Sequence, residues 1–150
     1  MRVSDIMTPN PACCMPDTRL PEVARMMADG DCGEIPVVEN LDTRIPVGVI
    51  TDRDITCRAV AKDLNPSEMT AADCMTANPV VTVTPDLSVE ECALLMEDHK
   101  IRRVPVLDES GGVCGIVALA DIASNTSKRD AGDVLQEVSE STRTASSTGD

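Results

Sequence analysis

The sequence predicts an α/β fold built from two copies of a β-α-β-β-α unit, and three observations support this prediction. First, the chain repeats itself: residues 5–8 read DIMT and residues 73–76 read DCMT, with further matches at nearly the same spacing. Second, apolar residues recur at helical spacing shortly after each repeat begins. Third, two short runs rich in β-branched residues follow each expected helix. Two copies are too few for a solenoid, so we expect a pseudo-twofold pair that shares one core.

The first repeat contains a signal for each of its expected elements. A short apolar strand is expected over 12–15, directly after Pro11. Helical spacing then places four apolar side chains on one face, those of Leu20, Val23, Ala24 and Met27. Strands are expected over 35–38 and 47–51, and a helix over 52–62 closes the repeat.

The second repeat follows the same order. The apolar face of its first helix is formed by Val89, Cys92, Ala93 and Met96. Ser88 and Glu91 have the spacing of a capping box, which predicts that this helix begins after Ser88. A second helix is expected to begin at about Leu119, and the Gly111-Gly112 pair is a hairpin signal. The expected strands cover 80–83, 104–107 and 113–117.

These matches divide the chain into four expected segments. They are the first repeat, a linker, the second repeat and a C-terminal segment, at 1–62, 63–72, 73–127 and 128–150. Pro66 acts as a helix breaker within the linker. The C-terminal segment is polar and rich in Ser and Thr, so we expect a short helix over 130–138 followed by a disordered tail.

Composition and charge restrict the classes of partner. Hydrophobic residues make up 42% and charged residues 26% of the chain, which are globular values. The sequence has no apolar run long enough to span a membrane and no secretory signal, so we expect a cytoplasmic protein without a membrane partner. A net charge of −13 repels nucleic-acid phosphates, and no Phe, Tyr or Trp is present to stack on bases. We therefore expect no nucleic-acid partner.

The seven cysteines and the single histidine do not follow a known metal or catalytic pattern. No CxxC pair occurs, so the thiols are interpreted as small hydrophobes and no metal is expected. The alternative is a thiol- or metal-responsive sensor that uses the adjacent Cys13 and Cys14. His99 is interpreted as part of a solvated helix end. Because no nucleophile–base arrangement or Gly-rich phosphate loop stands out, we expect no catalytic residues and no enzymatic activity.

One short segment has the chemistry of a ligand site. A buried strand is expected to end at Thr51 and a helix to begin immediately after it, which directs backbone N–H groups toward an anion. The Thr51 hydroxyl can bond to a phosphate, and the Asp54 carboxylate can accept hydrogen bonds from a ribose diol. The alternative is that the two residues only cap the helix.

Together these features resemble a tandem pair of CBS (cystathionine β-synthase) domains, a stand-alone Bateman module, over about residues 3–123. The resemblance rests on the Asp-x-Met-Thr starts, on apolar-Pro-Val strands, and on the stretches GVITDRDI and GIVALADI. It implies a regulatory protein that senses energy state or metabolites and requires no cofactor. The implied ligand is AMP, ADP or ATP, with S-adenosylmethionine or NAD as further options, and the implied protein partner is an unidentified effector.

The resemblance also implies a homodimer in which paired modules stack through their helices into a disc. Helix faces that contain Met26, Met27, Leu94 and Leu95 are compatible with this stacking if they are exposed. They are equally compatible with a buried core, so the dimer rests on analogy.

In the family, ligands bind in two clefts between the repeats. The resemblance places Thr51, Arg53 and Asp54 on one side of the first cleft. It places Asn78, Pro79, Val80 and Val81 opposite them, at the position of the base. Arg102 and Arg103 are implied phosphate contacts, because two guanidiniums suit an anion; the alternative is a solvated strand start.

The second, weaker cleft departs from the family pattern. Asp121 remains for a ribose, and the base position is formed by Pro11, Ala12 and Cys13. Ala118 stands where a hydroxyl residue belongs, and Glu34 brings a carboxylate that repels phosphate. We expect this cleft to be empty, weak, or suited to an uncharged or cationic nucleoside. A further alternative is a protein-interaction module in which both clefts are degenerate.

Overall fold

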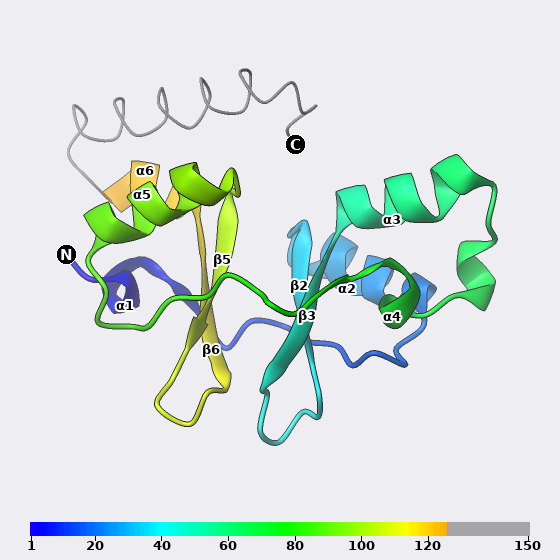
Figure 1. Cartoon of the computed structure of the whole chain (residues 1–150), viewed down its shortest axis with the longest axis horizontal. Helices are drawn as coiled ribbons and strands as arrows, with labels where there is room; N and C mark the ends of the chain where they lie inside the picture. Colours follow the sequence, from blue (N-terminus) through cyan, green and yellow to red (C-terminus); the bar gives the residue numbers. More distant parts are fainter. Residues whose placement is uncertain (126–150) are drawn as a thin grey trace. The chain divides into compact units, whose positions relative to one another are not determined.

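The computed structural model describes residues 1–125, which form two compact units (Figure 1). Among the described residues, unit 1 contains Met1–Pro9, Thr82–Asp108 and 114–125. Unit 2 contains Asn10–Val81 and Glu109–Val113. The units do not follow the sequence repeats, because the start of the first repeat belongs to the unit built mainly from the second.

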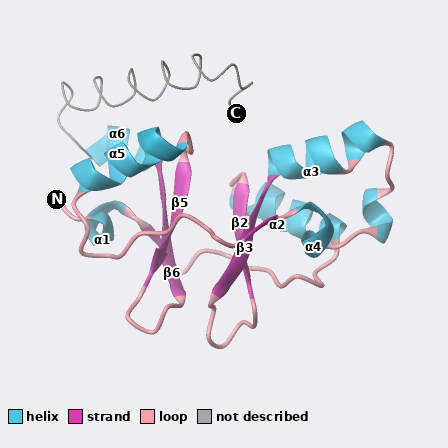
Figure 2. Ribbon diagram, viewed as in Figure 1, coloured by secondary structure: helices cyan, strands magenta, loops and turns pink. Residues whose placement is uncertain are grey.

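Unit 2 combines a three-stranded sheet with short helices (Figure 2). The sheet has the order β2-β3-β4, and both pairings are antiparallel. Its strands are β2 (Glu34–Val38), β3 (Pro46–Thr51) and β4 (Thr76–Ala77). Its α-helices are α2 (Leu20–Gly30), α3 (Asp52–Arg58) and α4 (Ala71–Cys74), with 3-10 turns at Val60–Lys62 and Pro66–Glu68.

Unit 1 has a matching set of elements around a second three-stranded sheet, of order β1-β6-β5. Its strands are β1 (Thr8–Pro9), β5 (Arg103–Leu107) and β6 (Val113–Ala118). Its helices are α1 (Val3–Ile6), α5 (Val89–His99) and α6 (Leu119–Asn125). The mixed α/β fold class predicted from the repeats is therefore confirmed.

The two longest helices begin where the apolar spacing predicts. Helix α2 begins at Leu20 and α5 at Val89. The Ser88 hydroxyl oxygen accepts a hydrogen bond from the Glu91 N–H at 3.1 Å, which confirms the expected cap. Helix α3 is shorter than expected, since it ends at Arg58 and a 3-10 turn follows. The helix expected over 130–138 lies outside the described residues.

The first strand expected in each repeat is not a full strand. Only Cys14 of 12–15 forms a bridge, in parallel with Val37. Only Val83 of 80–83 does the same, in parallel with Val106. Prolines stand close to both segments, and a proline has no N–H to donate to a neighbouring strand. The pairing therefore stops after one residue.

The segments with the sequence Asp-x-Met-Thr cross to the sheet formed by the other repeat. Strand β1 pairs with β6, and β4 pairs with β3. The methionine of each segment lies over the glycine of the paired strand, Met75 over Gly48 and Met7 over Gly115. A Cβ on Gly48 would lie 2.7 Å from the Thr76 carbonyl oxygen. These two glycines are required because the crossing segment packs directly on the strand.

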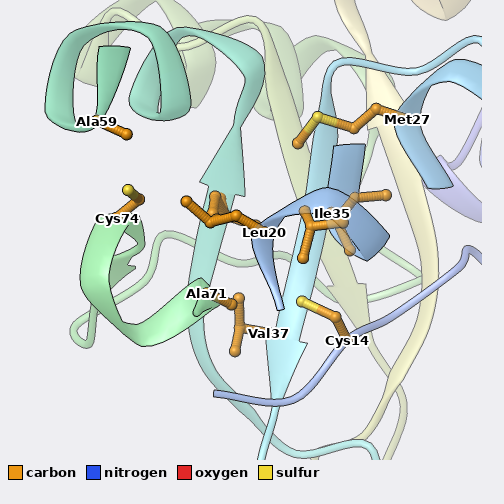
Figure 3. Packing of buried hydrophobic residues seen from close by; sticks show 10 residues of the cluster. Cys14, Leu20, Met27, Ile35, Val37, Ala59, Ala71 and Cys74 are labelled. Atoms are coloured by element: carbon orange, nitrogen blue, oxygen red, sulfur yellow. The ribbon is translucent and has the colours of Figure 1, made fainter. Parts of the chain in front are cut away.

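The core of unit 2 lies between its sheet and its helices (Figure 3). Leu20 and Ile35 are each 1% exposed, and Val37 is fully buried. Cys14 and Cys74 also belong to this core, as expected for thiols used as small hydrophobes. With no aromatic residue in the chain, aliphatic and sulfur-containing side chains fill the interior.

The apolar helix positions considered for dimer stacking differ in exposure. Met27 is only 8% exposed and packs in the core of unit 2, so it offers no open face. It lies seven residues after Leu20, on the same buried side of α2. Met26 is partly buried against that core, and Leu95 is partly buried. Leu94, in contrast, is 60% exposed.

Candidate functional site

Thr51 and Asp54 form a reciprocal cap at the point where β3 ends and α3 begins. The Thr51 Oγ1 accepts a hydrogen bond from the Asp54 N–H at 3.0 Å. The Asp54 Oδ2 accepts from the Thr51 N–H at 2.9 Å. This is a capping box in which aspartate takes the place of the usual Glu or Gln. The local arrangement follows from the short spacing, because both partners lie within one turn.

The cap occupies only part of each side chain. The Thr51 hydroxyl accepts one hydrogen bond and keeps its proton to donate. The second carboxylate oxygen of Asp54, Oδ1, lies 3.9 Å from Arg58 Nη2, which is beyond hydrogen-bond distance. The Asp54 side chain is 15% exposed, so it is not fully closed off from solvent.

Arg58 fixes the far end of α3 to the rest of unit 2. Its Nη1 donates to the backbone carbonyls of Cys74 and Met75, at 2.9 Å each. The carbonyls belong to the end of α4 and the residue after it. Arg58 therefore positions α3 against α4, and with it the carboxylate of Asp54.

The predicted base-contacting segment follows β4 in the same unit. The Asn78 N–H donates to the Val47 carbonyl at 3.1 Å, and its side-chain Nδ2 donates to the Pro46 carbonyl at 3.3 Å. Pro79 is exposed, while Val80 and Val81 are partly buried. Arg53 is exposed in the first turn of α3. Asn78 thus ties this segment to β3, the strand that ends at Thr51.

Glu34 begins β2, at the end of the sheet where β3 ends. It pairs with Thr51 across β2 and β3, so a carboxylate-bearing residue lies directly opposite the cap of α3. Arg102 likewise contacts its own unit, since its carbonyl accepts from the Leu119 N–H at 2.8 Å. The expectation that Arg102 and Arg103 face Thr51, and that Glu34 faces Ala118, joins residues of different units and stays a prediction.

The second repeat contains half of the same cap. The Asp121 Oδ2 accepts from the Ala118 N–H at 2.8 Å, which matches the Asp54 contact in geometry. Ala118 has no hydroxyl oxygen to accept a hydrogen bond from the Asp121 N–H, as expected from the sequence. Arg103 is the first residue of β5 and is partly buried. The repeats therefore share the carboxylate and differ in the hydroxyl.

The residues expected at the second base position contact an arginine that sequence reasoning did not select. Arg44 Nη2 donates to the Pro11 carbonyl and, at 3.0 Å, to the Cys13 Sγ. Ala12, between them, is exposed. Arg44 lies more than thirty residues away, in the turn between β2 and β3, with a left-handed φ of 57°. No spacing pattern marks such a contact, because only the fold brings the turn to this segment.

The cysteine thiols of the core are poor candidates for reaction. Burial raises the pKa of the Cys14 thiol to about 12 and that of Cys92 to about 11. Among residues 1–125, no three His, Cys, Asp or Glu side chains are arranged to hold a metal ion. No helix in the same range is long and apolar enough to cross a membrane.

Comparison with known proteins finds relatives that match most of the chain. The chain is 36% identical to the CBS domain-containing protein YhcV of Bacillus subtilis over 138 residues, which covers 91% of this chain and 94% of that protein. It is 40% identical to an uncharacterized protein of Methanopyrus kandleri over 101 residues. That match covers 67% of this chain but only 50% of the relative, so the chain spans half the length of that protein.

Solved structures show the same fold. Hypoxic Response Protein I, solved with two coordinated zinc ions, has a TM-score of 0.73 and 33% identity over 84% of this chain and 99% of that one. The CBS domain pair of protein MJ0100, in complex with 5-methylthioadenosine and S-adenosyl-L-methionine, has a TM-score of 0.73 and 30% identity over 83% and 98%. CBSX2 in complex with AMP has a TM-score of 0.68 and 25% identity over 89% and 97%.

The family described as CBS domain matches the chain twice, at residues 3–59 and 71–128. These two matches cover both sequence repeats and most of the chain. Together with the shared fold and the length of the relatives, they show that the chain belongs to the CBS domain family and carries two copies of the domain in tandem.

Proposed function

We propose that this protein binds an adenosine-containing ligand and reports the ligand's level to a partner protein, without catalysing a reaction itself. Two similar CBS pairs are solved with such ligands, one with 5-methylthioadenosine and S-adenosyl-L-methionine and one with AMP. The observation that carries the proposal for this chain is the Asp54 carboxylate, which is fixed through one oxygen and retains the other for a ribose diol.

The roles of the site residues follow from the cap geometry. A carboxylate oxygen accepts charge-assisted hydrogen bonds from hydroxyl groups, and Asp54 is held in place by the Thr51 N–H before any ligand arrives. The Thr51 hydroxyl keeps a proton that can be donated to a phosphate oxygen. Asn78, Pro79, Val80 and Val81 are proposed contacts to the base. That Arg102 and Arg103 contact the phosphate rests on the family resemblance.

The ligand class is proposed as AMP, ADP or ATP, with S-adenosylmethionine or NAD as the alternatives. Asp121 is the corresponding ribose contact of the weaker second site, where Ala118 offers no hydroxyl. The proposal also includes a homodimer that lies in the cytoplasm and an effector protein that receives the signal. The high acidic charge of the chain supports a small ligand and a protein partner over nucleic acid.

The first test measures ligand binding directly. Calorimetry and thermal unfolding with each of the five ligands should identify one that binds, and a ligand at about 100 times its Kd should stabilise the fold by roughly 2.7 kcal/mol. Asp54→Ala should make the binding free energy of that ligand less favourable by about 1.5–3 kcal/mol, because it deletes charge-assisted hydrogen bonds to the ribose.

Two control variants separate binding from folding. Asp54→Asn keeps an oxygen that accepts from the Thr51 N–H but loses the charge, so it should remain folded and still bind weakly. Asp121→Ala, at the matching position of the other repeat, should leave the tighter site nearly unchanged. Unaltered affinity in Asp54→Ala and in Asp54→Asn would remove Asp54 from the site.

A further inference from the structure

A cavity of about 310 Å³ lies within unit 2, beside the start of α2. It is lined by the adjacent Cys13 and Cys14 and by charged side chains of both signs, those of Asp17, Arg19 and Glu22. Its volume is in the range that takes a small organic molecule. The cavity has no role in the proposed nucleotide chemistry of Thr51 and Asp54.

Cys13 is the nucleophile of this cavity. It is only partly buried, and its Sγ accepts a hydrogen bond from Arg44 Nη2 at 3.0 Å. The same nitrogen donates to the Pro11 carbonyl, which also receives the Cys13 thiol proton at 3.5 Å. The Cys13 sulfur is therefore in direct contact with a guanidinium group.

One N–H group of the Arg44 guanidinium is not used in these contacts. Its Nε is buried and has no hydrogen-bond partner among the described residues. A buried donor without a partner is costly, and such groups are typically satisfied when a ligand or water arrives. Arg44 does not line the cavity itself, and it acts there through the Nη2 contact with the Cys13 sulfur.

Two other cysteines provide comparisons within the same chain. Cys14 also lines the cavity, but it is 3% exposed, and burial raises its pKa to about 12. It is therefore unreactive near neutral pH. Cys57 is exposed on α3, so it is more accessible than Cys13.

We propose that Cys13 is a modification site that forms a mixed disulfide with a small zwitterionic disulfide of the amino-acid or peptide type. The carboxylates of Asp17 and Glu22 suit its ammonium group, and the guanidinium of Arg19 suits its carboxylate. This inference does not depend on the proposed nucleotide contacts of Thr51 and Asp54, although Cys13 also belongs to the expected base position of the weaker second cleft.

The reaction is a thiol–disulfide exchange. Cys13 first loses its proton to water. Its sulfur attacks one sulfur of the reagent, so that a new S–S bond forms to Cys13 as the original S–S bond breaks. The released half leaves as a thiolate and takes up a proton. Cys13 is oxidised and the released half is reduced, so no further oxidant is needed.

A metal ion is disfavoured at the same place. A cation beside Cys13 would lie against the Arg44 guanidinium, which contacts the sulfur at 3.0 Å. Like charges at that separation repel each other strongly in a partly buried site. The observed contact therefore favours covalent chemistry at the sulfur.

The experiment uses the reduced full chain and oxidised glutathione as the probe. Samples are quenched over time and each cysteine is quantified by peptide mass spectrometry. Cys13 should react about tenfold faster than the more exposed Cys57, since a guanidinium contacts its sulfur and the charged lining orients the reagent. Cystamine, which carries only positive groups, and dithiodiglycolate, which carries only negative groups, should each react more slowly than oxidised glutathione at Cys13.

Variants then test the role of the guanidinium. Arg44→Gln should slow the reaction of Cys13 with oxidised glutathione to about the rate of Cys57. Arg44→Lys should retain part of the difference between the two rates. Cys57→Ser should leave the Cys13 rate unchanged. The proposal is overturned if Cys57 reacts first in the wild-type chain, if Arg44→Gln has no effect on Cys13, or if the reduced protein binds zinc or copper in a manner lost in Cys13→Ser.

Discussion

At the residue scale, Thr51 and Asp54 form a cap that uses only part of each side chain. The hydroxyl oxygen of Thr51 and one carboxylate oxygen of Asp54 are used in the cap, while the hydroxyl proton and the other carboxylate oxygen are not. The two interpretations of these residues in the sequence are therefore compatible. A preformed cap also lowers the entropy that a ligand must remove when it binds.

The cap itself can be tested without any ligand. Thr51→Ala removes the acceptor for the Asp54 N–H and should lower the free energy of unfolding by about 1 kcal/mol. Thr51→Ser keeps the acceptor and should cost much less. Urea unfolding followed by circular dichroism measures both. Equal losses in the two variants would show that the methyl group of Thr51, rather than its oxygen, stabilises the start of α3.

At the element scale, the important feature is the exchange of short segments between repeats. Strand β4 belongs to the second repeat and pairs with β3 of the first, while β1 belongs to the first repeat and pairs with β6 of the second. Each crossing strand has only two residues. A strand this short is stable only when it is hydrogen-bonded to a larger sheet. In both crossing segments a methionine packs on a glycine of the paired strand.

The two glycines should respond differently to the same substitution. In Gly48→Ala the new methyl group meets the Thr76 carbonyl oxygen at 2.7 Å, which is backbone and cannot move easily. In Gly115→Ala the nearest atoms all belong to the flexible Met7 side chain. We expect Gly48→Ala to cost about 1–3 kcal/mol and Gly115→Ala less, measured by urea unfolding.

A double-mutant cycle completes this test. Met7→Ala should offset part of the cost of Gly115→Ala, because it removes the atoms that clash. Met75→Ala should offset little of the cost of Gly48→Ala, because the Thr76 carbonyl remains. Similar rescue in both pairs would contradict the assignment of the Gly48 clash to the backbone.

At the scale of the whole molecule, the charge is the dominant property. The chain carries 13 basic and 26 acidic residues, and this excess sets up a negative field around the protein. Such a field repels polyanions, although individual cationic side chains such as Arg44 and Arg103 are present. This field therefore disfavours nucleic acid as a partner.

This charge predicts that the protein does not bind DNA or RNA. Binding to a labelled duplex or single strand should be absent even at low salt, where electrostatic attraction is strongest. Fluorescence anisotropy measures this, with a basic DNA-binding protein as the positive control. Micromolar binding at low salt that weakens as salt rises would contradict the prediction.

Much of the fold was determined by sequence alone, because its signals are local. Helices α2 and α5 follow from apolar residues three and four apart, and the cap at Ser88 follows from a three-residue spacing. The duplicated motifs were sufficient to identify the CBS family. The alternative that Thr51 and Asp54 cap the helix is confirmed, since both lie within one helical turn, whereas their contact with a ligand stays a prediction.

Only the tertiary structure decided which distant segments meet. Nothing in the sequence places Glu34 opposite Thr51, or Arg44 against Cys13, because strand register and turn position determine those contacts. The expected strands over 12–15 and 80–83 became single bridges for a related reason, since pairing depends on the partner strand and on prolines that cannot donate. Local spacing specifies elements, whereas contacts between elements depend on packing that no single segment encodes.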